Sequence, residues 1–180
     1  MTGITRYRAA QVLADYFGTE VRHDGTYYDA YSAPDEQGRR WKVMSDSSIN
    51  CQRREDGRKV SAGRDYSVEL VSPICQYEDI EKLQEIIRKL REAGAFCNDS
   101  AGIHIHVNAA PFDAPHLRNL VNIVASKEDM IYRALQVNRG REMSYCKKVD
   151  PDFLERLNKQ KPKEMEQLKR LWYDGYDGSR

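Results

Sequence analysis

The spacing of apolar residues predicts a helix almost at the start of the chain. In "MTGITRYRAAQVLADYFG", residues 1–18, Ala9, Val12, Leu13 and Tyr16 fall on one side of a helix with 3.6 residues per turn. A threonine before this run is a typical N-cap, and Gly18 is a typical stop. We therefore expect an amphipathic helix that packs its apolar side on a core.

Three stretches after this helix alternate with the two-residue period of strands. They are "TYYDAYSA" (26–33), "RRWKVMSDSSI" (39–49), which ends in an Asp-Ser-Ser turn, and "DYSVELVSPI" (65–74), which proline closes. The intervening "PDEQGRR" is typical of a hairpin loop. The polar and basic residues between Asn50 and Arg64 include Gly57 and Gly63, and we interpret them as an exposed loop.

Helical spacing returns in the second half of the chain. Residues 77–94 predict a helix, an alternating stretch at 102–107 predicts another strand, and Asp113 with an early proline predicts the start of a helix that runs to about Leu135. Two short charged helices divided by a lysine-proline stretch should follow, with Arg180 in a loop. The pattern predicts an α+β fold.

Composition narrows the class of protein. The 180 residues suffice for a single domain, residues 1–180, and contain no run long and apolar enough for a membrane span and no secretory leader. Lys and Arg total 29 against 28 Asp and Glu, and the two signs alternate, which gives no electrostatic case for nucleic acid. We expect a cytoplasmic protein whose partners are small molecules or other proteins.

The stretch "GIHIHV" (102–107) concentrates two of the four histidines. On a strand His104 and His106 share one face, and Ile103, Ile105 and Val107 share the other, which predicts that the apolar face is buried. Two imidazoles on one strand face often begin a metal site. A half-exposed strand that carries imidazoles by chance is the alternative.

Glu69 is a second unusual polar residue, because carboxylates are depleted from strand interiors and it lies between Val68 and Leu70. It could face water or pair with an arginine of the 50–64 loop. It could also share a concave sheet surface with His104 and His106, where carboxylate and imidazole would bind magnesium or manganese.

The motifs "RRWKVMSDSSI", "YSVELVSPI" and "GIHIHV", in this order and at these separations, resemble the amidoligase family, which is similar to glutamine synthetase and the glutamate–cysteine ligases. The resemblance extends over nearly the whole chain, including Arg141 to Cys146. It implies a curved antiparallel sheet whose inner face holds ATP and divalent metal ions, with helices on the other side. Such enzymes join a small-molecule or peptide carboxylate to an amine through an acyl phosphate.

The resemblance also implies roles for individual residues. Glu69 and His104 would be metal ligands, and His106, with Asn108 beside it, would face the nucleotide. The remaining residues carried over belong to the catalytic and substrate end of the cleft: Asp46 and Ser48 in the Asp-x-Ser turn, and Arg141, which would balance phosphate charge. Mg²⁺ or Mn²⁺ and ATP are the implied cofactors.

Two departures from the family pattern shape the expectation further. Family members usually open with a strand that carries Glu-x-Glu, whereas this sequence begins with the predicted helix. They also continue into C-terminal strands with another acidic residue and an arginine, and this sequence shows neither. We therefore expect a member that lacks its first strand and its C-terminal strands, with little activity as given.

Two other functions remain in competition with a ligase. One is a metal hydrolase built on the H-x-H strand, and the other is a non-catalytic binding or accessory domain of the same fold. The oligomeric state and the two groups to be joined stay open, because fold does not fix substrate.

Overall fold

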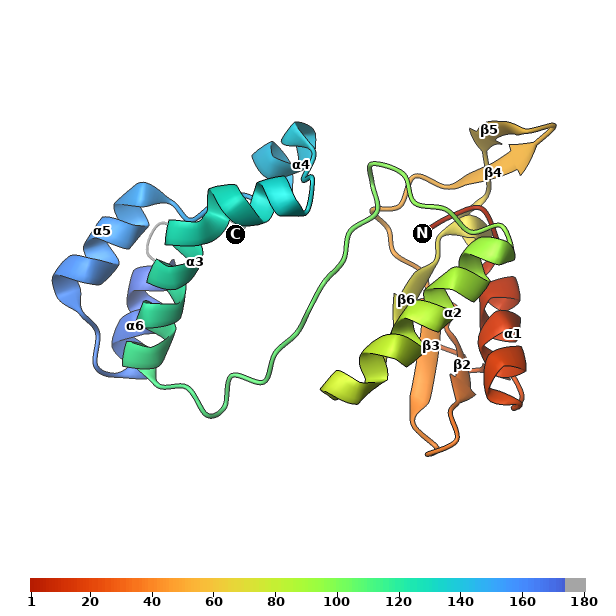
Figure 1. The fold of residues 1–180 in the computed structure, drawn as a ribbon, viewed down its shortest axis with the longest axis horizontal. Coiled ribbons are helices and arrows are strands. Elements are labelled where there is room, and N and C mark those ends of the chain that lie inside the picture. The colour runs from red at the N-terminus through yellow and green to blue at the C-terminus, as the bar shows by residue number, and fades with distance from the viewer. Residues whose placement is uncertain (174–180) are drawn as a thin grey trace. The chain divides into compact units, whose positions relative to one another are not determined.

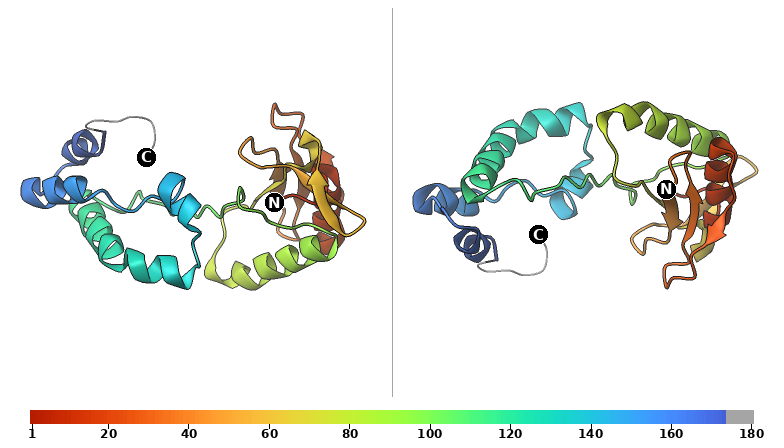
Figure 2. Two further views of the ribbon diagram at one scale, coloured as in Figure 1. Left: turned by 90° about the horizontal axis from the view of Figure 1, so that it is seen from above. Right: turned by 90° about the horizontal axis from the view of Figure 1, so that it is seen from below.

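The computed structural model describes residues 1–173, and the chain forms two compact units, Met1–Ile103 and His104–Arg180. The first unit contains a four-stranded sheet, a two-stranded sheet and two α-helices, and the described part of the second is helical (Figures 1 and 2). The expected loop at the end of the chain lies outside the described residues. The elements of the first unit are α1 (Arg6–Phe17), β1 (Arg22–His23), β2 (Tyr31–Pro34), β3 (Arg40–Met44), β4 (Gln52–Glu55), β5 (Arg58–Ser61), β6 (Glu69–Val71) and α2 (Ile80–Glu92).

Helix α1 follows the sequence prediction at both ends. The Thr5 side chain accepts a hydrogen bond from the backbone N–H of Arg8, and Gly18 adopts the left-handed conformation at φ 66° that ends the helix. Ala9, Val12 and Leu13 are buried, as their spacing predicts, and Leu13 is fully inaccessible. The apolar stripe of α1 therefore forms one wall of the main core.

The main sheet is antiparallel with strand order β1-β2-β3-β6, which confirms the α+β class (Figure 1). Ala33 lies opposite Trp41, and Val43 lies opposite Leu70, so these side chains share one face of the sheet. This face packs on α1 and α2 in one hydrophobic cluster. The opposite face carries Lys42, Met44 and Glu69 in the same register. Helices α1 and α2 thus cover only the apolar face of the sheet, and Lys42 and Glu69 lie on the uncovered face.

A partly buried ionic network joins the β2–β3 hairpin to Asp79, the residue before α2. Arg39 bonds the Asp35 carboxylate through Nε at 2.8 Å and the Asp79 carboxylate through both terminal nitrogens at 2.8 and 2.7 Å. The indole N–H of Trp41 also donates to Asp35 at 3.2 Å. Hydrogen bonds from Arg39 hold the pKa of Asp79 far below its ordinary value. Burial opposes ionisation of Asp35, but the hydrogen bonds that it accepts still lower its pKa.

Residues 50–64 are not the loop that their polarity predicts. They contain the antiparallel β4–β5 hairpin, in which Arg53 pairs with Val60 and Arg54 with Lys59. Asp56 and Gly57 have φ values of 50° and 76°, as a tight hairpin turn with two left-handed residues requires. The Asp-Gly dipeptide was the available sequence indication, and the near absence of apolar side chains concealed it.

The predicted strand at 102–107 is wrong. Residues 101–109 are neither helix nor strand, and Ile103, Ile105 and Val107 are 90, 83 and 75% exposed. Alternation indicates an extended conformation, but a strand also needs a neighbour for its backbone N–H and C=O groups, and the spacing of apolar residues does not supply one. The expected burial of the apolar face is therefore also wrong.

The second unit contains four helices among the described residues: α3 (Ala114–Ala134), α4 (Arg139–Ser144), α5 (Pro151–Gln160) and α6 (Met165–Tyr173). Asp113 caps α3 through His116 N–H at 2.9 Å, as predicted. The two short helices divided by a lysine-proline stretch are α5 and α6, whereas α4 was not predicted. Phe153 and Leu157 form the core of this unit with Leu171, and Trp172 at its edge is 42% exposed.

Leu13 lies in the main core and Ile105 in the exposed segment at 101–109, so substitutions at the two positions should change the free energy of unfolding by different amounts. Leu13→Ala should lower the free energy of unfolding by about 2–5 kcal/mol, because it leaves a cavity in the main core. Ile105→Ala should change it by less than about 0.5 kcal/mol, because the side chain is exposed. Urea titrations followed by circular dichroism measure both values. A loss for Ile105→Ala as large as that for Leu13→Ala would place Ile105 in a core.

The Arg39 network predicts a pH dependence of stability. The Asp35 and Asp79 carboxyls have lower pKa values in the folded chain than in the unfolded chain, so they stabilise the fold above the ordinary aspartate pKa of about 3.9 and lose this effect as the pH falls toward their folded values. Arg39→Gln should lower the urea midpoint at neutral pH, and the difference from the parent should narrow at about pH 3. A difference that is constant with pH would contradict this coupling.

Candidate functional site

Asp46 and Glu69 lie at neighbouring positions on the polar face of the sheet. Because Met44 pairs with Glu69, the antiparallel register brings Asp46 opposite Ser67. At this position the Ser67 hydroxyl forms the hydrogen bonds that the backbone of a strand partner would otherwise form. Its Oγ accepts from Asp46 N–H at 2.9 Å and donates to Asp46 C=O at 2.6 Å. Ser67 is fully buried. The two Ser67–Asp46 hydrogen bonds fix the backbone of Asp46. The Asp46–Ser67 pair lies two residues from the Met44–Glu69 pair along the two strands.

The Asp46 side chain organises the turn that follows β3. Its Oδ1 accepts hydrogen bonds from Ser48 N–H at 2.8 Å and from Ser48 Oγ at 2.7 Å. A carboxylate that bonds the backbone two residues ahead is a common turn device. The Asp-Ser-Ser turn predicted from the sequence is therefore present, and it holds Asp46 and Ser48 together.

Arg6 of α1 supports this end of the sheet from within the protein. Its side chain is 8% exposed, and its guanidinium donates to the C=O groups of Ser67, at 3.0 Å, and Arg64. It also forms an ion pair with Asp29 in the loop before β2, and this pairing lowers the pKa of the Asp29 carboxyl. Sequence patterning missed Arg6, because a single arginine in an amphipathic helix is usually exposed.

The acidic residues act together on one charged group. The amino group of Met1 donates to Val68 C=O at 2.7 Å. Burial lowers the pKa of this amino group, while the nearby Cys97, Asp46, Glu69 and Cys51 raise it, in decreasing order. The charges of Asp46 and Glu69 thus both favour the protonated form of this amino group. Two carboxylates are a donor set that fits Mg²⁺ or Mn²⁺, which prefer oxygen ligands.

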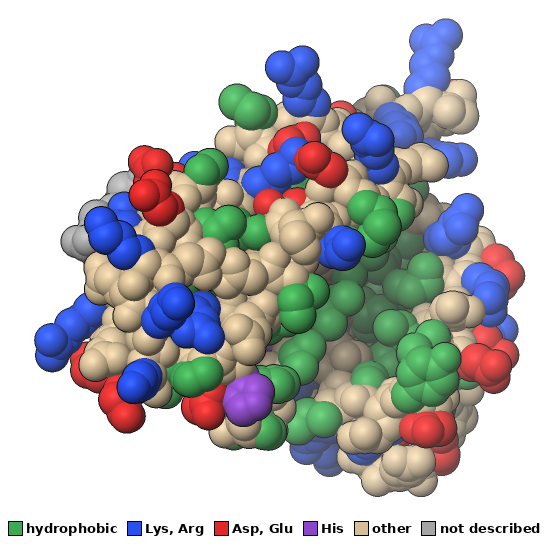
Figure 3. Space-filling model, turned by 60° about the vertical axis from the view of Figure 1, so that its left-hand side comes forward, with side chains coloured by type: hydrophobic (Ala, Val, Ile, Leu, Met, Phe, Trp, Pro, Cys, Tyr) green, Lys and Arg blue, Asp and Glu red, His purple; other side chains and the backbone are tan. Residues whose placement is uncertain are grey.

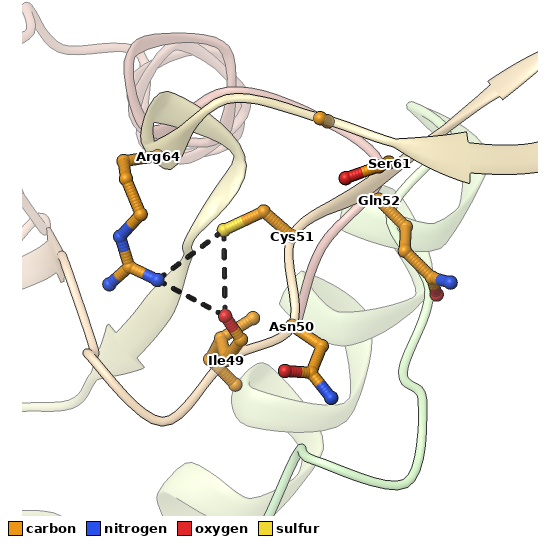
Figure 4. Close-up of a pocket in the computed structure, with 7 residues that line it drawn as sticks. Ile49, Asn50, Cys51, Gln52, Ser61 and Arg64 are labelled. Carbon is orange, nitrogen blue, oxygen red and sulfur yellow. Dashed lines mark hydrogen bonds between the residues drawn. The ribbon is translucent and has the colours of Figure 1, made fainter.

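An open pocket of about 440 Å³ adjoins the Asp46 turn (Figure 4). Arg64 spans one side of it, donating to Ile49 C=O at 3.2 Å and to the Cys51 sulfur at 3.7 Å. Its other terminal nitrogen donates to Asp46 C=O at 2.9 Å. The base of the β4–β5 hairpin contributes Gln52 and Ser61 to the lining. Nothing in the spacing of the sequence singled out Arg64.

The other predicted site residues belong to the second unit. His104 and His106 are exposed in the segment without regular structure, and Asn108 Oδ1 accepts from Ala110 N–H at 3.0 Å. Arg141 lies in α4, where its guanidinium stacks on the Tyr145 ring at 4.9 Å. The structure thus groups Asp46, Ser48 and Glu69 in the first unit. Within residues 1–173 no three His, Cys, Asp or Glu side chains converge as a set of metal ligands.

The surface and the helices add two findings. Over much of the face shown in Figure 3, Lys and Arg side chains are interspersed with Asp and Glu. None of the helices in the described part of the chain is both long and apolar enough to cross a bilayer.

Comparison with known proteins gives one family. A family model described as "Putative amidoligase enzyme" matches residues 1–180. No curated protein and no solved structure matches the chain. The family match covers both units, including the three motifs that suggested the same resemblance.

The Ser67 contacts predict a local effect on stability. Ser67→Ala removes both hydrogen bonds to Asp46 and leaves its backbone N–H unpaired, while Arg64 still donates to its C=O, so the free energy of unfolding should fall by about 1–3 kcal/mol. Ser72→Ala, at an exposed position just after β6, should have almost no effect. Urea unfolding measures the difference. Equal effects of the two substitutions would show that the Ser67 bridge does not stabilise this end of the sheet.

Proposed function

Since the chain belongs to the amidoligase family, we propose that it is an ATP- and divalent-metal-dependent carboxylate–amine ligase. The observation that carries the proposal is the match of the family model to all 180 residues. The placement of Asp46, Ser48 and Glu69 at one end of the sheet supports it. A metal hydrolase has no comparable support from the family match.

The proposed reaction has two steps. A carboxylate oxygen of the first substrate attacks the γ-phosphorus of ATP, so that a new O–P bond forms and ADP leaves. The amine nitrogen then attacks the acyl carbon, the C–O bond to phosphate breaks, and phosphate departs with the electron pair. The nitrogen loses a proton to a base, and the products are an amide, ADP and phosphate.

The first unit supplies the carboxylates in this proposal. Glu69 is half-buried on the polar face, and no hydrogen bond or ion pair joins its side chain to another described residue, so its carboxylate oxygens are available as metal ligands. Bound Mg²⁺ or Mn²⁺ would neutralise the negative charge of the phosphates. Asp46 and Ser48, held by their mutual hydrogen bonds, orient the carboxylate substrate.

The remaining roles in this proposal are assigned from the family motif alone. We assign His104 to the metal, His106 and Asn108 to the nucleotide, and Arg141 to the charge on the transferred phosphoryl group. Each assignment follows the family motif residue by residue. The exposure of His104 and His106 leaves both imidazoles accessible to a ligand.

A direct test compares ATP turnover in matched carboxylate variants. ADP release should require Mg²⁺ or Mn²⁺, a carboxylate substrate and an amine. Glu69→Gln should reduce the rate at least roughly 100-fold, since even substitutions of residues that support metal ligands cost 10- to 100-fold. Glu92→Gln removes an exposed carboxylate from the end of α2 and should leave the rate unchanged.

Amide formation, followed by mass spectrometry, separates a ligase from an ATP hydrolase. ADP release without amide would argue against a ligase. Equal rates for Glu69→Gln and Glu92→Gln would remove Glu69 from the metal site while leaving the ligase activity itself in place.

A further inference from the structure

The β4–β5 hairpin carries unbalanced positive charge. Arg54 and Lys59 lie directly opposite each other, so their side chains share one face of the hairpin. Both cations lie over the ring of Phe96, at 5.5 and 4.8 Å from its centre. Gln52 and Ser61 are the other residues on this face, so the face carries no acidic side chain.

The acids of the hairpin do not compensate these cations. Glu55 forms its ion pair with Arg53 at 3.3 Å on the other face. Arg58 is exposed, and neither it nor Arg54 or Lys59 pairs with an acidic side chain of the described residues. Like charges directly opposite each other destabilise a strand pair, which an anion bound between them would relieve.

The same residues also present free main-chain groups. Cys51 C=O accepts from Ala62 N–H, so by alternation the N–H and C=O of Arg54 and Lys59 point away from the partner strand. At the base of β4 the equivalent outward groups of Gln52 are already paired with Thr2 and Gly3. Beyond this base, no described residue bonds the outward groups of Arg54. An outward edge of this kind accepts an additional strand.

We propose that the β4–β5 hairpin binds an extended acidic peptide. The peptide backbone pairs with the outward edge at Arg54 or Lys59, and carboxylates on alternate residues of the peptide meet the cations of the Arg54–Lys59 face, since alternate side chains of a strand share a face. Main-chain bonding favours a peptide, because its backbone has N–H donors and C=O acceptors for both kinds of outward group, whereas a phosphate has only acceptors. The hairpin connects the Asp46 turn to β6, so the peptide binds beside the candidate site.

The binding inference stands apart from the proposed ligase reaction, and its test needs no turnover. A fluorescein-labelled peptide of alternating Glu and Thr is titrated with the protein at low ionic strength, and fluorescence anisotropy reports binding. The matched peptide of alternating Gln and Thr should bind much more weakly. Added salt should weaken binding of the acidic peptide, because exposed charges are screened.

Three variants test the assigned surface. The double variant R54Q/K59Q should bind the acidic peptide roughly fivefold or more weakly, and the single variant Lys59→Gln roughly two- to fivefold more weakly, as expected for exposed ion pairs. Lys59→Gln keeps Arg54 over the Phe96 ring, so the single variant remains informative if the double variant unfolds. R88Q/K89Q removes the same charge from exposed positions on α2 and should bind like the parent.

Three results would overturn the proposal. The first is no binding of the acidic peptide at low ionic strength. The second is an equal loss of affinity in R88Q/K89Q and in the hairpin variants, which would indicate attraction by overall charge. The third is tighter binding of a single-stranded oligonucleotide or a phosphorylated peptide than of the carboxylate peptide, which would assign the hairpin to phosphate chemistry.

Discussion

The buried guanidinium of Arg6 is the contact on which the arrangement of the first unit depends. It joins α1 to the Asp29 loop and to the C=O groups of Arg64 and Ser67, three segments far apart in the sequence. Removing a charge from water is costly, and the Asp29 carboxylate and several hydrogen bonds offset this cost. Because Ser67 in turn holds Asp46, the position of the candidate site follows from an arginine on the opposite side of the sheet.

The elements that the sequence predicts well have a periodic pattern of apolar residues and a capping or turn residue that marks where the element begins or ends. Helices α1 and α2 combine an apolar stripe with a glycine beyond the last turn, and α3 begins at its Asp113 cap, and these features act within a few residues of the chain. The β2–β3 hairpin is equally local. The β4–β5 hairpin has no hydrophobic pattern, since Arg54 and Lys59 occupy positions where a buried strand has apolar residues. Its Asp-Gly turn alone indicated it.

The segment around His104 failed as a prediction for a different reason. Its alternation is genuine, yet a strand exists only in a ladder, and the ladder partner is decided by distant parts of the chain. The same limit applies to the site. Asp46 and Ser48 are neighbours in sequence and were predicted together, and the closeness of Glu69 follows from the β3–β6 register. Arg6 and Arg64 contribute through contacts that no spacing in the sequence encodes.

The two tryptophans differ in a way that bears on how the protein can be observed. Trp41 is fully enclosed in the main core with its indole N–H on Asp35, whereas Trp172 lies at the edge of the smaller core in α6. Each unit therefore contains one tryptophan, which is shielded from solvent in the first unit and in contact with it in the second. A shielded indole emits at shorter wavelength than one in contact with water. Trp41 emission therefore reports on the first unit and Trp172 emission on the second, so the two units can be followed separately without a label.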